Sequence, residues 1–372
     1  MNVRFCLTCA VLALTGCAEP WKLAEKSGSA ILPGAKAVPG GHCESSAMMN
    51  ALLYLGYPVN ESMIAGAGGA LSFTLQRGTF PFIGARNADM REQFFKAAGI
   101  RWHLSAQGVD RAPDAGWAEI DSLLERGIPV VLRVDMRFLP YLYGGKYGSA
   151  YMSFGWHLVT LFGIDRTKGI ALVSDTGQTV LREIALKDLH KARTSGTKVY
   201  PPHGEYYWIE EAPQGYSTDW NALAAHSLDL VIGNYEGGSL AALENYGKDL
   251  AEIETYSKQV FLLPAVLEYM AGNIEDFGTG GASFRMLYRD FLLQATAESE
   301  YAGLSRALPP LEESIAAWHA LSAEFRALAP LVKKMDKGGR LEAWERLRIL
   351  ADDLYRKEFR FYTELKRIRG EA

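Results

Sequence analysis

The chain has 372 residues, of which 48% are hydrophobic and 22% charged, and its formal net charge is −4 at pH 7. This near-average composition excludes wholesale disorder, a collagen-like repeat and a protein of many membrane spans, and the length suggests two domains. The acidic balance excludes the broad basic surface of a nucleic-acid binder, so we expect no nucleic-acid partner. All four cysteines lie near the N-terminus, so no disulfide can staple the body of the fold: Cys6, Cys9, Cys17 and Cys43.

The first seventeen residues have the pattern of a secretory signal. Arg4 precedes an apolar run of about ten residues, and small residues follow. The ending Leu14-Thr15-Gly16-Cys17 resembles the lipobox of bacterial lipoproteins, which implies cleavage before Cys17 and lipidation of that cysteine. We therefore expect a signal peptide at 1–16 and a tether at 17–29.

The lipobox resemblance also predicts a location. A lipidated Cys17 would attach the protein to a membrane in the bacterial cell envelope, and more than one acyl chain would make the attachment stable. By analogy with bacterial lipoproteins, Ala18 after the cysteine favours the periplasmic face of the outer membrane.

A helix is predicted to begin at Cys43. Two glycines and His42 precede it, and a run of helix-forming residues follows as far as Gly56. The partial positive charge and free amide groups of a helix N-terminus favour a thiolate and can hold an oxyanion. A buried structural thiol is the alternative, but the flanking Glu44 and Ser45 are poor surroundings for one.

The remaining elements follow from apolar spacing. Helical spacing over 88–98 and 117–125 is followed by strand patterns. The predicted strands cover 128–135, 156–163, 169–174 and 206–209. After Pro213 the spacing is helical throughout, over 219–232, 239–251, 260–274, 283–297, 311–328 and 341–368. An α+β domain over 30–213 and a helical domain over 214–372 are therefore expected.

Cys43, His157 and Asp175 fit a papain-type arrangement, with a cysteine at a helix start, a histidine on a distant strand and an acid after the next strand. The cysteine would attack a carbonyl, the imidazole would take and return the proton, and the acid would orient the imidazole. Antiparallel pairing of two strands joined by a tight turn can set His157 beside Asp175. Asp165 is the alternative acid, although it lies at the far end of the His157 strand.

Two motifs resemble a known family. The stretch around Gly41-His42-Cys43-Glu44-Ser45-Ser46 resembles the N-terminal domain of the butirosin biosynthesis protein H family, and the segment 278–292, beginning Gly278-Thr279-Gly280-Gly281, resembles its accompanying helical domain of unknown function. The family looks papain-like and similar to the leader peptidases of bacteriocin exporters. Its butirosin member moves an aminoacyl group from a carrier-protein thioester to an aminoglycoside amine. The resemblance implies an acyl-accepting Cys43, with His157 as general base and Asp175 as its orienter.

The chain departs from this family pattern in two respects. Ala35, Lys36 and Ala37 occupy the region where papain-type enzymes carry an oxyanion glutamine, so the Cys43 amide needs another donor, for which His42 and Ser45 are the candidates. Export would also separate the protein from cytoplasmic carrier-protein thioesters. A carrier-protein partner is therefore expected only if the lipobox interpretation is wrong.

Other motifs add less. The aromatic residues before His157 would either border a substrate cleft or cap the core, and the cleft candidates are Tyr151, Phe154 and Trp156. Arg285 would clamp an anion or, the favoured interpretation, make a structural salt bridge. His, Cys, Asp and Glu have no structural-zinc spacing in the sequence, and we expect neither a metal nor a cofactor.

The sequence therefore predicts a cysteine-nucleophile enzyme that forms a thioester at Cys43. The acyl group would pass to an amine, as in an acyltransferase, or to water, as in an amidase or peptidase. Its substrate would be a small molecule or peptide with an acyl or amide group. The alternative is a non-catalytic envelope protein that uses the same cleft to bind a peptide or small ligand, which the missing glutamine favours and the three site residues oppose.

Overall fold

The computed structural model describes residues 28–371, except 106–115, 143–152, 199 and 258. The predicted signal peptide, Cys17 and Tyr151 lie outside the described residues, as does nearly all of the predicted tether. Within the described part of the chain, every helix is too short or too polar to cross a bilayer.

An antiparallel sheet organises the first half of the chain. In the described residues it has seven strands, and β6 pairs with both β5 and β7. Six strands follow the order β4 (Trp102–Leu104), β9 (Tyr206–Ile209), β5 (Val130–Val134), β6 (His157–Asp165), β7 (Ile170–Ser174) and β8 (Arg182–Ala185). The seventh, β1 (Ser29–Ile31), pairs with the C-terminal end of β6. A separate hairpin joins β2 (Thr74–Gln76) to β3 (Phe82–Gly84).

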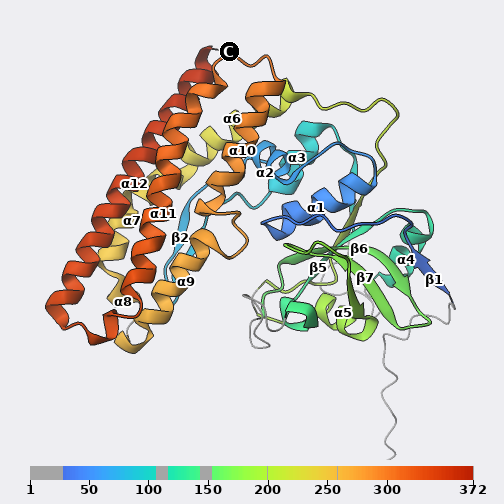
Figure 1. The fold of residues 1–372 in the computed structure, drawn as a ribbon, viewed down its shortest axis with the longest axis horizontal. Coiled ribbons are helices and arrows are strands. Elements are labelled where there is room, and N and C mark those ends of the chain that lie inside the picture. The colour runs from blue at the N-terminus through green and yellow to red at the C-terminus, as the bar shows by residue number, and fades with distance from the viewer. Residues whose placement is uncertain (1–27, 106–115, 143–152, 199, 258, 372) are drawn as a thin grey trace, which may run out of the picture.

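Helices cover both faces of this sheet. Figure 1 shows α1 (Cys43–Tyr54) on one face and α5 (Leu186–Arg193) on the other, the face against which α4 (Trp117–Glu125) also packs. Successive β6 residues serve the two sides: Leu158 belongs to the core beneath α1, whereas Val159 belongs to the core with α4 and α5. A strand covered on both faces has a continuous apolar sequence, which explains why β6 is buried at every position. The Thr160 hydroxyl fixes α1 to β6 by donating to the Ala47 carbonyl at 2.7 Å.

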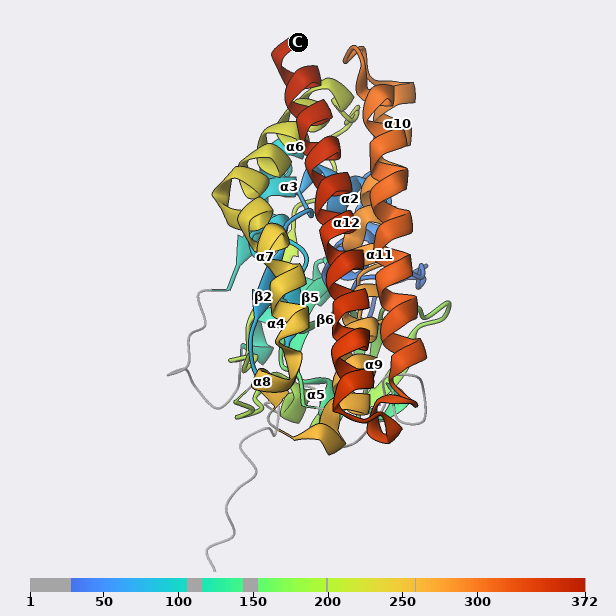
Figure 2. The ribbon, with the colours of Figure 1, turned by 90° about the vertical axis from the view of Figure 1, so that its left-hand side faces the viewer.

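The second half is helical, as predicted. The long helix α12 runs beside α7 and α11 (Figure 2). The larger helices are α6 (Trp220–Asn234), α7 (Leu240–Ala251), α9 (Leu263–Glu275), α10 (Arg285–Glu298), α11 (Leu308–Leu328) and α12 (Lys337–Glu371). Shorter pieces of this half are α8 (Ile253–Ser257), the π-helical turn Tyr235–Ser239, and 3₁₀ turns at Val260–Leu262, Ala282–Phe284, Leu304–Ala307 and Val332–Lys334. Two further 3₁₀ turns, Met136–Phe138 and Pro140–Leu142, lie in the first half between β5 and β6.

The two halves share one hydrophobic core. Helices α2 (Glu61–Ala67) and α3 (Met90–Ala98), from the first half, pack on α10 and α6 of the second. At the closest point a Cβ on Gly66 would lie 2.1 Å from a ring carbon of Phe291, so only glycine allows α2 this near to α10. Helix α10 of the second half therefore packs against α2, which in turn contacts α1, the helix that begins at Cys43.

Candidate active site

The structure places Cys43 at the first turn of α1. His42 is the N-cap residue, and its Nδ1 accepts the Ser45 amide N–H at 3.3 Å. The Cys43 side chain is only partly buried, and its Sγ lies 3.9 Å from the carbonyl oxygen of Trp156. The amide N–H of Cys43 is one of the first-turn donors that a helix leaves without an intrahelical acceptor. The sulfur therefore lies at the positive end of a buried helix.

His157 and Asp175 meet at the edge of this site. The His157 Nε2 lies 2.7 Å from Oδ1 of Asp175, and both side chains are buried. Two further donors hold the carboxylate: the Thr176 amide at 2.6 Å and the Tyr141 hydroxyl at 2.9 Å. Asp165, the alternative acid, ends β6 roughly 25 Å along the strand from His157. Its Oδ1 accepts the Lys168 amide instead.

The charge state of His157 follows from its neighbours. Burial on its own would lower the pKa of the imidazole, but the Asp175 carboxylate and hydrogen bonds with Asp175 and Cys43 raise it to about 10. Because Nε2 is bonded to Asp175, Nδ1 is the ring nitrogen left for the Cys43 sulfur. This raised pKa favours the protonated form of His157, whose pKa both Asp175 and Cys43 raise.

The loop before Cys43 is held by the carboxylate of Glu61, which no sequence motif indicates. Glu61, at the start of α2, accepts the Gly41 amide at 2.6 Å and the His42 amide at 2.8 Å. It also accepts the Ser45 hydroxyl at 2.9 Å. The hydroxyl of Ser45 is thus engaged in fixing the helix start. A carboxylate at this position in the chain carries no local signal, because its partners lie 16 to 20 residues earlier.

His42 is held neutral in this environment. Burial, followed by the positive charges of Arg86 and His157, keeps the pKa of His42 well below its usual value. Its ring packs edge-on against Phe284, with 5.0 Å between centroids. The two oxyanion candidates therefore differ: Ser45 donates its hydroxyl to Glu61, whereas His42 is a buried, uncharged imidazole that directly precedes Cys43.

Aromatic side chains form a cluster around Trp156, whose backbone carbonyl lies 3.9 Å from the Cys43 sulfur. The Trp156 ring packs edge-on against Tyr200 at 5.3 Å, and the Arg133 guanidinium lies 4.5 Å from the Trp156 ring centre. Phe154 packs against the same Tyr200 ring at 5.9 Å. Tyr200 is 43% exposed and was not singled out in the sequence, since it lies 44 residues after Trp156. Tyr151 lies outside the described residues.

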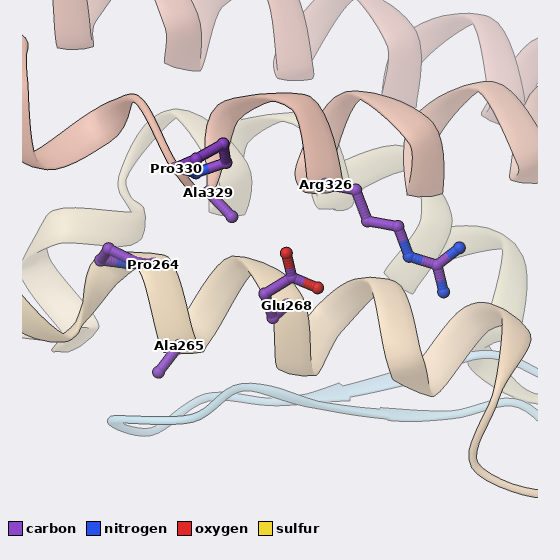
Figure 3. A pocket seen from close by; sticks show the side chains of 6 residues that line it. All are labelled: Pro264, Ala265, Glu268, Arg326, Ala329 and Pro330. Atoms are coloured by element: carbon purple, nitrogen blue, oxygen red, sulfur yellow. The ribbon is translucent and has the colours of Figure 1, made fainter. Parts of the chain in front are cut away.

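A separate hollow lies in the helical half. It has a volume of about 360 Å³ between α9 and the end of α11 (Figure 3), lined by Pro264, Ala265, Glu268, Arg326, Ala329 and Pro330. Its cation, Arg326, is paired with Asp276 at 2.6 Å. Cys43, His157 and Asp175 are not among the residues that line it. Among the described residues, no group of three or more His, Cys, Asp and Glu side chains could hold a metal ion.

An α+β fold with a cysteine, histidine and aspartate brought together, followed by a helical region, defines the class of this chain. Residues 42–176 match the family model described as butirosin biosynthesis protein H, N-terminal, and residues 187–365 match a domain of unknown function. These two matches, one over the first half and one over the helical second half, agree with the expected family and domain layout. A comparison with curated proteins finds no match.

Proposed function

We propose that this protein is an acyl-transfer enzyme that uses Cys43 as its nucleophile. The observation that carries the proposal is the position of His157, which is bonded to Asp175 on one side and interacts with the Cys43 sulfur on the other. A thiol at a helix start with an imidazole beside it is the arrangement of a cysteine nucleophile paired with its base. The match to a biosynthesis-protein family supports a synthetic role.

The proposed reaction has two steps. The Cys43 thiolate attacks the carbonyl carbon of the donor, and the leaving group departs with the proton from His157 Nδ1, leaving a thioester on Cys43. An acceptor amine then attacks this thioester, gives its proton to His157, and releases Cys43 as a thiolate. Water as acceptor would make the same site an amidase or peptidase. Asp175 holds the imidazole orientation through both steps.

The oxyanion formed in each step requires donors near the sulfur. The Cys43 amide is one donor, and His42 is the second in this proposal, since the Ser45 hydroxyl already donates to Glu61. The packing of the Cys43 helix on an antiparallel sheet that carries the histidine supports a papain-like fold for residues 30–213. Phe154 and Trp156, joined by Tyr200, form the surface on which the acyl group of a small molecule or peptide would rest.

The proposed site of action is the bacterial cell envelope, with lipidated Cys17 as the attachment to the outer membrane. Metabolic labelling with an alkyne fatty acid tests this part alone: label should enter the full chain and be absent from Cys17→Ser. If the full chain carries no fatty-acid label and keeps its N-terminal residues, the proposed lipidation of Cys17 is wrong. A cytoplasmic protein would then have access to carrier-protein thioesters, and the acyl-transfer proposal would keep its chemistry with a different donor.

The acyl-enzyme itself is the decisive test. The full chain is incubated with acyl thioesters of N-acetylcysteamine, and the peptide that contains Cys43 is analysed by mass spectrometry. We expect an acyl adduct on Cys43 that hydroxylamine removes, a much slower adduct in His157→Gln, and none in Cys43→Ser. Saturable binding of the thioesters without any adduct would instead favour the non-catalytic binding protein.

A further inference from the structure

The helical half contains a strained, buried turn immediately before α10. Five consecutive residues have positive φ: Gly280 at 66°, Gly281 at 94°, Ala282 at 45°, Ser283 at 51° and Phe284 at 71°. The last three carry side chains and are buried, although residues other than glycine avoid this region. Ser283 also buries its hydroxyl without a hydrogen-bond partner among the described residues. A strained turn of this kind is stable only where the surrounding structure holds it in place. Such strain is found most often at functional sites.

A fully buried ion pair holds the turn in place. Arg285 donates to the Ser283 carbonyl at 2.7 Å and pairs with Glu358 of α12 at 3.0 Å, where both side chains are inaccessible to solvent. Glu358 also accepts the indole N–H of Trp318 at 2.8 Å and the hydroxyls of Ser314 and Tyr235. Arg285 is thus a structural salt-bridge residue, and three helices fix the backbone of the turn through it.

The turn presses against the loop that carries the nucleophile. The Phe284 ring packs edge-on against His42, the N-cap of the Cys43 helix. A Cβ on Gly41 would lie 3.1 Å from the Gly280 Cα, so the two backbones are nearly in contact. Gly278 lies against His42 in the same way, since a Cβ there would be 3.9 Å from the His42 Cα. Glu61 fixes this loop from one side, and the strained turn fixes it from the other.

We propose that the 278–284 turn positions the nucleophile, so that the helical half is part of the active site rather than an appended module. Phe284 is the positioning residue, and it acts through His42 on the first turn of α1. The strain of the turn presents the Phe284 ring to His42 at a point that an unstrained helix start would not reach. This inference rests on the proposed function, because it assigns a role relative to the Cys43 thiolate.

The test compares Phe284→Ala with Phe361→Ala, in the full chain. Phe361 is a buried phenylalanine of α12 whose ring contacts are Tyr235 and Tyr288, so its truncation matches the loss of volume without touching the turn. The first readout is the rate of Cys43 alkylation by iodoacetamide between pH 5 and 9, followed on the Cys43 peptide by mass spectrometry. We expect Phe284→Ala to lose about ten-fold or more of this rate at pH 6, as misplaced reacting groups do. Phe361→Ala should keep the wild-type pH profile.

The second readout separates positioning from chemistry. Hydrogen exchange of the amides in residues 40–46 should speed up in Phe284→Ala and stay unchanged in Phe361→Ala. The positioning role is overturned if hydrogen exchange in residues 40–46 is unchanged in Phe284→Ala. It is also overturned if the wild-type Cys43 reacts faster than an ordinary thiol and Phe284→Ala keeps that alkylation profile. If the parent itself reacts like an ordinary thiol and His157→Ala makes no difference, the proposed function fails, and the exchange result still decides the positioning. Should Phe284→Ala not fold, Phe284→Leu gives the same comparison with smaller shifts in the same direction.

Discussion

Tyr141 donates its hydroxyl to Oδ2 of Asp175 at 2.9 Å, while His157 takes the other carboxylate oxygen. Burial and the Asp175 charge hold the pKa of Tyr141 well above its usual value, so the phenol stays protonated and remains a donor. Asp175 is therefore held at both carboxylate oxygens. In the proposed mechanism Asp175 orients the His157 imidazole, and Tyr141 orients Asp175.

Tyr141→Phe should accordingly weaken the site without unfolding it. A hydrogen bond to a charged group contributes about 1.5–3 kcal/mol. We therefore expect roughly a ten-fold fall in acyl-enzyme formation on Cys43, measured with the thioester donors. Tyr216→Phe is the matched control, because it loses a hydrogen bond to the Ala98 carbonyl away from this group. Equal rates in the two variants would show that Tyr141 does not orient Asp175.

The raised pKa of His157 predicts how stability depends on pH. Its pKa is about 10 in the folded protein and near 6.5 in an unfolded chain. The folded state therefore binds the proton more tightly, and this stabilisation is fully present below about pH 6.5 and is lost as the pH rises towards 10. The free energy of unfolding, measured by urea denaturation from pH 6 to 10, should fall less steeply in His157→Gln than in the parent. Parallel pH profiles would mean that His157 does not hold its proton in the folded state.

Glu61 should contribute to stability as well as to the site. Its carboxylate accepts two amides and one hydroxyl from the nucleophile loop. Glu61→Gln removes the charge and one acceptor oxygen, and we expect a loss of about 2 kcal/mol in the free energy of unfolding. Glu236→Gln is the control, because that carboxylate bonds Tyr362 and Lys366 on the surface, where an ion pair contributes little, and stability should change much less than in Glu61→Gln. Similar losses in the two variants would argue against a special role for Glu61.

Ser283→Gly separates stability from reactivity. Glycine relieves the positive φ of this position, which is 51°, and removes a buried hydroxyl without a described partner. Stability should therefore rise by about 1 kcal/mol in urea denaturation, whereas Cys43 alkylation at pH 6 should slow because the turn is less rigid. In the control Ser322→Gly, within the regular helix α11, glycine should lower stability by about 1 kcal/mol. A Ser283→Gly protein that gains stability and keeps full reactivity would show that the strain serves no purpose at the site.

Much of the fold was predictable from local patterns. The strands expected at 156–163 and 169–174 correspond to β6 and β7, and the helix expected to begin at Cys43 begins there. The strand β4 was missed, because three residues are too few to show a period of two. The helical second half was predicted as a set of helices, but its contact with the Cys43 loop was not.

The site divides in the same way. Cys43, His157 and Asp175 were recognisable because each is a reactive residue type at a characteristic place in its own element. Tyr141 belongs to the aromatic set before His157, but its bond to Asp175 was not predicted. The contacts of Glu61 and Phe284 were not predicted either, because these side chains carry no local signal of their distant partners. Phe284 lies 242 residues after His42, and no period or turn signal joins them.

The sequence by itself predicted the secondary structure of the main elements, the family, and a site of Cys43, His157 and one of two aspartates, since these predictions depend on neighbours within a few positions. The tertiary structure alone decided that Asp175 rather than Asp165 meets His157, that this carboxylate raises the pKa of His157, and that a strained turn of the helical half packs against the loop before Cys43. Those outcomes depend on distances and burial between distant segments. Packing and electrostatic fields arise only when the chain has closed on itself.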